Sequence, residues 1–62
     1  MGESTGTPNY LALAAQEAAD CRMYLREELA KADGVEAIVL LRLIGAATEL
    51  ERGIVELAEA KR

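Results

Sequence analysis

Two long stretches of helix-forming residues, separated by one break, limit what this chain can fold into. Residues 8–32 contain no Gly and no β-branched residue, and Ala, Leu, Glu and Arg dominate them, which favours an α-helix. Asp33-Gly34 is the strong helix-breaking signal in the middle of the chain. Either Gly34 ends the first helix in the left-handed conformation or Asp33 caps the second. Because both readings leave a very short connection, we expect two antiparallel neighbouring helices.

The predicted fold is therefore all-α, an antiparallel two-helix hairpin. Thr7 is a suitable N-cap and Pro8 suits the first turn of a helix. The leader that precedes them lacks an apolar period, so we interpret it as flexible and polar, and not as a signal peptide. In chain order the predicted parts are this leader, helix one, the turn and helix two, at about residues 1–7, 8–32, 33–34 and 35–61.

Each predicted helix places apolar side chains on one stripe when residues are set at 100° per step. We expect these stripes to face each other across the hairpin. The predicted helix–helix core consists of Leu11, Ala18, Leu25, Leu29, Val39, Leu43, Leu50, Ile54 and Leu57. Charged residues such as Glu27 and Lys31 fall on the opposite side of helix one.

The first half of helix two is apolar around nearly its whole circumference. Between residues 35 and 47 only Glu36 and Arg42 are charged. A helix that is apolar on all sides is usually buried, and one neighbouring helix covers only one side. The residues off the main stripe form the predicted oligomer or partner interface, where a glycine would permit a close helix crossing. They are Ile38, Leu41, Ile44, Gly45 and Val55.

The length of the chain also favours association. A domain of 62 residues buries little surface alone and commonly needs a disulfide, a metal or a second copy. One Cys and no His exclude an internal disulfide and the usual zinc sites. We therefore expect a homodimer, most simply a four-helix bundle, because two-fold pairing is the commonest form of oligomer.

The composition gives little support for catalysis. Without His there is no Ser–His or Cys–His pair, and we interpret Cys21, on the stripe of helix one, as a small buried hydrophobe. Carboxylates such as Glu17 and Glu51 are interpreted as a solvated acidic surface. We predict no catalytic residue, no metal site and no cofactor.

Arg22 and Arg26 are the candidates for a different function, because they lie one turn apart on helix one. Paired in a dimer they would form a basic surface for nucleic acid. The expected architecture resembles that of helical-hairpin dimers that bind plasmid copy-number RNA, but no motif matches and no residue role is implied. The net charge of −4 disfavours nucleic acid as a partner. Residues 35–47 are too short for a membrane span.

The sequence therefore predicts a small, non-catalytic, homodimeric interaction protein. We expect it to act in the cytoplasm as a regulator or adaptor that binds another protein. Two alternatives stay open: a nucleic-acid-binding hairpin dimer that uses Arg22 and Arg26, and a structural subunit of a larger assembly.

Overall fold

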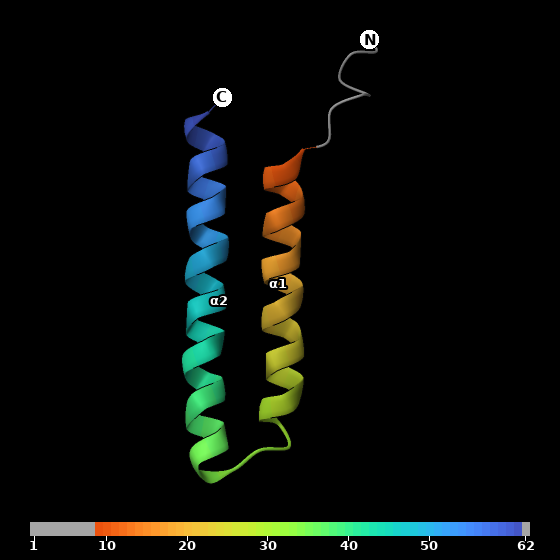
Figure 1. Cartoon of the computed structure of the whole chain (residues 1–62), viewed down its shortest axis with the longest axis vertical. Coiled ribbons are helices and arrows are strands. Elements are labelled where there is room, and N and C mark those ends of the chain that lie inside the picture. Colours follow the sequence, from red (N-terminus) through yellow and green to blue (C-terminus); the bar gives the residue numbers. More distant parts are fainter. Residues whose placement is uncertain (1–8, 62) are drawn as a thin grey trace.

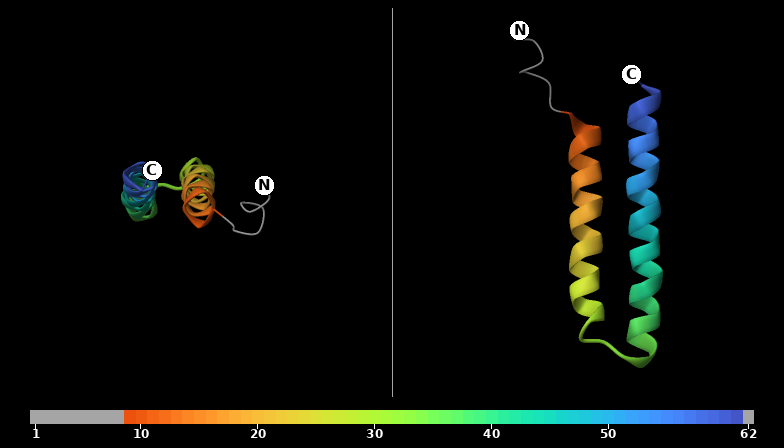
Figure 2. Two further views of the ribbon diagram at one scale, coloured as in Figure 1. Left: turned by 90° about the horizontal axis from the view of Figure 1, so that it is seen from above. Right: turned by 180° about the vertical axis from the view of Figure 1, so that it is seen from behind.

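A computed structural model describes residues 9–61 and shows two α-helices side by side (Figure 1). Helix α1 spans Tyr10–Leu29 and helix α2 spans Gly34–Ala60. The helices run antiparallel, and the view along their axes shows a single layer two helices wide (Figure 2). The predicted all-helical hairpin is confirmed for the described residues, which contain no strand.

The start of α1 is fixed by Asn9, which occupies the N-cap position. The backbone N–H of Ala12 donates to Oδ1 of Asn9 over 3.1 Å, which satisfies one of the free amides of the first turn. The predicted leader at residues 1–7, the predicted cap Thr7 and the predicted first helical residue Pro8 lie outside the described residues.

The turn between the helices depends on Gly34, the first residue of α2. Its φ angle is +62°, in the left-handed region that is costly for residues with a Cβ atom. Neither interpretation of this break holds in full, because α1 already ends at Leu29 with Ala30 as its C-cap, so the left-handed Gly34 does not end it. Asp33 does hold the predicted N-cap position of α2, but without the capping hydrogen bond.

The interior of the hairpin is thin. Among the described residues only Ala18 and Ala47 are buried, at 4% and 7% exposure. Half-buried residues surround these two alanines on the facing sides of the helices: Leu11, Ala15, Arg22, Leu25 and Leu29 of α1, and Ala37, Leu40, Ile44, Glu51, Ile54 and Ala58 of α2. These positions recur in steps of three and four residues, which keeps one side of each helix against its neighbour.

Four of the predicted core residues lie on the exposed surface of α2. They are Val39, Leu43, Leu50 and Leu57, with exposed fractions between 39% and 58%. Each precedes a half-buried or buried position of α2 by one residue, which is about 100° of helix rotation. Apolar residues occupy both of these neighbouring sides of α2, so hydrophobicity alone does not select the side that faces α1.

The predicted interface residue Ile44 also differs from its expected place. It is half-buried on the side of α2 that faces α1. The side of α2 toward α1 also carries the buried Ala47, and Glu51, which forms an ion pair with Arg22 of α1. The other predicted core residues lie on the facing sides of the two helices: Leu11, Ala18, Leu25, Leu29 and Ile54.

Candidate protein–protein interface

A shallow apolar groove of about 310 Å³ lies between the two helices on one side of the layer. The buried alanines Ala18 and Ala47 lie at its floor, and the exposed leucines Leu43 and Leu50 stand at its edge. None of its seven lining residues is charged. We call this surface the groove face, lined by Ala18, Cys21, Leu25, Leu43, Ala46, Ala47 and Leu50.

The α2 side of the groove continues along the helix as an uncharged row of exposed residues. We call this row the α2 stripe: Val39, Leu43, Ala46, Leu50, Gly53 and Leu57. Its members are separated alternately by four and three residues, the spacing of a coiled-coil seam. Helix α2 thus carries two such seams, one against α1 and one exposed to solvent in the single chain.

Most of the predicted interface residues lie together on the opposite side of α2. Ile38, Leu41 and Val55 are 58%, 57% and 43% exposed, and Gly45 is exposed with them. At 100° per residue these four are turned well away from Leu43, so they form a separate surface, which we call the outer face. A Cβ atom on Gly45 would meet nothing within 4 Å among the described residues. The predicted close helix crossing at Gly45 is therefore not made by α1.

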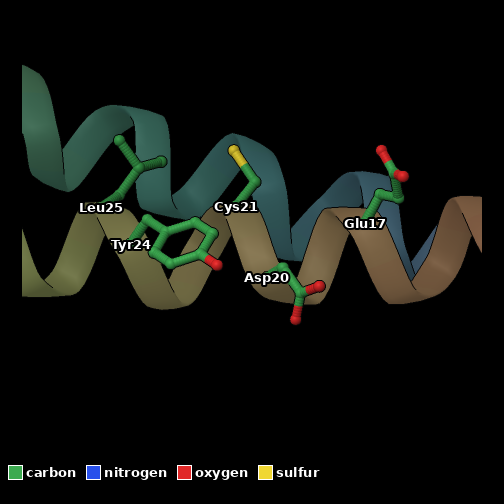
Figure 3. A pocket seen from close by; sticks show the side chains of 5 residues that line it. All are labelled: Glu17, Asp20, Cys21, Tyr24 and Leu25. Carbon is green, nitrogen blue, oxygen red and sulfur yellow. The ribbon is translucent and has the colours of Figure 1, made fainter.

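A second hollow follows α1 beside the groove and is lined by Glu17, Asp20, Cys21, Tyr24 and Leu25 (Figure 3). Cys21 is exposed, whereas the sequence analysis predicts a buried thiol, because it lies at the edge of the groove and not between the helices. A reactive thiolate needs a cationic neighbour. The charged residues that line this hollow are carboxylates, so it does not provide the environment of a catalytic cysteine.

The two arginines predicted for nucleic acid have different surroundings. Arg22 lies on the facing side of α1, and its Nη1 donates to Oε1 of Glu51 on α2. The side chains of Arg22 and Glu51 are 27% and 30% exposed. Arg26, one turn further along, is exposed. Because Glu51 engages Arg22, the structure does not bring Arg22 and Arg26 together as one open basic surface.

Glu51 also corrects the interpretation of the carboxylates. Glu51 is expected on a solvated surface, but it is half-buried on the side of α2 that faces α1. The basic residue Arg22, at a facing position of α1, accounts for this placement because it compensates the charge. The signal in the sequence is the three-and-four spacing that joins Ala47, Glu51 and Ile54.

The remaining ion pairs among the described residues are local, one between α1 and the turn that follows it and one within α2. Lys31 and Glu28 are 3.3 Å apart and Arg52 and Glu49 are 2.7 Å apart, with all four side chains mostly exposed. Within residues 9–61, no group of three or more His, Cys, Asp or Glu side chains is placed to hold a metal ion. Neither of the two described helices has the length and hydrophobicity needed to cross a membrane.

No family model matches the chain, and neither the curated proteins nor the solved structures contain a significant match. The candidate site is therefore defined by its geometry. That geometry consists of two exposed apolar surfaces on different sides of α2, the groove face and the outer face.

Proposed function

We propose that this chain is a small, non-catalytic interaction protein that works as a homodimer and binds another protein as a regulator or adaptor. The observation that carries the proposal is the contrast between a large apolar surface and a very small interior. Twelve large hydrophobic side chains of the described residues are exposed, whereas two alanines are the buried hydrophobic residues. Soluble monomers rarely expose apolar patches of this extent without a binding role.

The energetics of the hairpin support association. A fully buried Leu, Ile or Val side chain contributes about 1.5–3 kcal/mol to folding. In the described part of the chain no large side chain is fully buried, so little of this stabilisation is gained within one hairpin. A second layer of helices over either face would bury leucines and valines that are now exposed.

The chemistry of the polar residues supports a protein partner. The sequence has no His, and the hollow around Cys21 contains acidic side chains and no cation. The net charge is −4, and Arg22 is already paired with Glu51. Affinity for nucleic acid depends largely on free basic groups that contact phosphates, so these features favour apolar docking to a protein.

The partner is tested by affinity capture with the tagged full-length chain and its Leu41→Glu variant. Leu41 belongs to the outer face and is 57% exposed, so Glu is expected to block docking while the hairpin still folds. Leu13→Glu is the matched control, because Leu13 is 54% exposed on α1. Circular dichroism verifies the helix content of both variants.

The proposal predicts one co-purifying protein that is lost with Leu41→Glu and kept with Leu13→Glu. Recovery of nucleic acid in its place would contradict the proposal and favour the nucleic-acid alternative. Recovery of the chain alone, in rings or filaments, would favour a structural subunit.

A further inference from the structure

We infer that two copies of this chain pair through the groove face, with α2 lying antiparallel against the α2 of the second copy. The inference rests on the proposed homodimer and adds which of the two apolar surfaces forms it. The outer face then stays free for a different partner.

The spacing of the α2 stripe suits packing against another helix, and in particular against the α2 stripe of a second copy of the chain. From Val39 to Leu57 the steps are 4, 3, 4, 3 and 4 residues, a sequence that reads the same in both directions. Alternating steps of this kind keep a row of side chains against a second helix over several turns. Because the order of steps is symmetric, an antiparallel copy related by a two-fold axis presents the same row in register.

The side-chain sizes also match across such an axis. When the α2 stripes of two antiparallel copies pack together, the first residue of one stripe lies opposite the last residue of the other, and the small residues lie opposite leucines. The pairs join Ala46 to Leu50, Leu43 to Gly53, and Val39 to Leu57 of the second copy. A leucine opposite alanine or glycine can fill the space left by the small residue, which is how well-packed interfaces reach interior density. In the single hairpin, a Cβ atom placed on Gly53 would meet nothing within 4 Å among residues 9–61.

The distribution of charge favours α2 against α2 over α2 against α1. The α2 stripe is uncharged from Val39 to Leu57. Carboxylates line the neighbouring hollows: Glu17 and Asp20 in the hollow along α1, and Glu28 of α1 with Glu36 of α2 in the hollow beside Val39. Pairing α2 with α2 covers uncharged surface with uncharged surface and leaves these carboxylates at the rim, where they stay hydrated.

The area of this face suits a stable dimer. Helix α2 has 27 residues and is therefore about 40 Å long. Helix α1 has 20 residues and is about 30 Å long, so two adjacent helices of about 10 Å diameter give the whole face a footprint of about 700 Å². Each partner contributes about 800 Å² to an interface of standard size, so the dimer needs nearly all of this face, the α1 side of the groove included.

The outer face is less suited to self-pairing over the same length. Continuing the row of Ile38, Leu41 and Gly45 in steps of three and four leads to Thr48 and Arg52. Arg52 is an exposed cation that pairs with Glu49 of its own helix. The apolar part of the outer face is thus confined largely to the first half of α2, which suits a smaller contact with another protein.

The test compares two leucines on one helix with nearly equal exposure. Leu50 of the groove face is 58% exposed and Leu41 of the outer face is 57% exposed. Sedimentation of the full chain, Leu50→Glu and Leu41→Glu measures the dimer dissociation constant of each. We expect Leu50→Glu to weaken the dimer by at least about 100-fold, because it buries two unpaired charges near the axis, and Leu41→Glu to leave it unchanged.

The outcomes separate the two proposals. If the unmodified chain is a folded monomer, the homodimer itself is wrong. If the chain dimerises and the single variant Leu41→Glu abolishes the dimer, the homodimer stands and the assignment of the groove face is overturned, whether or not Leu50→Glu also abolishes it. The same holds if neither variant weakens it.

A second measurement needs no variant and so does not depend on Leu50→Glu folding. Cys21 is exposed at the edge of the groove in the single hairpin. We expect its thiol to react slowly with a maleimide at concentrations where the dimer forms, and faster on dilution below the dissociation constant. A labelling rate that does not change while the dimer dissociates would overturn the assignment.

Discussion

Arg22 of α1 and Glu51 of α2 form an ion pair between the facing sides of the two helices. Nη1 of Arg22 donates to Oε1 of Glu51, and both side chains are less than one third exposed. Among the described residues it is the ion pair that links α1 to α2, because the others join residues three positions apart in the chain. It identifies the sides of the two helices that face each other.

A double-mutant cycle on Arg22→Ala and Glu51→Ala measures this contact. We expect a coupling free energy of about 1 kcal/mol that decreases at high salt, since the pair is partly shielded from water. The exposed pair of Glu49 and Arg52 is the control, with an expected coupling of about 0.3–0.5 kcal/mol. The free energies of unfolding are taken from urea titrations at one chain concentration. Equal coupling free energies for the two pairs would contradict the expectation that the half-buried pair stabilises the protein more than the exposed pair.

Loss of the N-cap of α1 is expected to destabilise the protein. Asn9→Ala removes the acceptor of the Ala12 amide, and such changes cost about 1 kcal/mol. Asn9→Asp keeps an acceptor at the same position and is expected to retain most of the stability. Thermal unfolding followed by circular dichroism provides the comparison, and equal melting temperatures for Asn9→Ala and Asn9→Asp would show that the cap contributes nothing.

The same substitution at two glycines is expected to have opposite effects. Gly34→Ala places a Cβ atom at a φ of +62° and should destabilise the protein by about 1–2 kcal/mol. Gly45→Ala lies inside α2 in open space and should stabilise it by about 0.5–1 kcal/mol through helix propensity. Urea unfolding at one chain concentration gives both values. If Gly45→Ala is destabilising, another chain lies close against the outer face.

The sequence predicts the elements of this fold well because their signals are local. The break at Asp33-Gly34 and the long stretches of helix formers around it need no knowledge of the tertiary structure. The start of α1 shows the limit of such signals, because Thr and Pro are both favoured at helix starts and Thr7-Pro8 is therefore the predicted start. In the structure Asn9 is the N-cap.

The facing side of α2 is harder to predict from the sequence. A hydrophobic stripe identifies a facing side only when the other sides are polar, and α2 is apolar on more than one. A set of residues that includes Leu43 and Leu50 is uncharged, and a set that includes Leu40 and Ile44 is apolar except for Glu51; the two sets differ by about 100° of rotation. The choice between them rests on the pairing of Arg22 with Glu51, which requires both helices at once.

The central claim is that the single hairpin is half of a larger helical bundle. Sedimentation equilibrium of the pure chain at micromolar concentration tests it most directly. The account predicts a folded species of about twice the chain mass of 6.7 kDa, with helix content that falls as the dimer is diluted. A helical, cooperatively folded species of 6.7 kDa across the whole concentration range would contradict it.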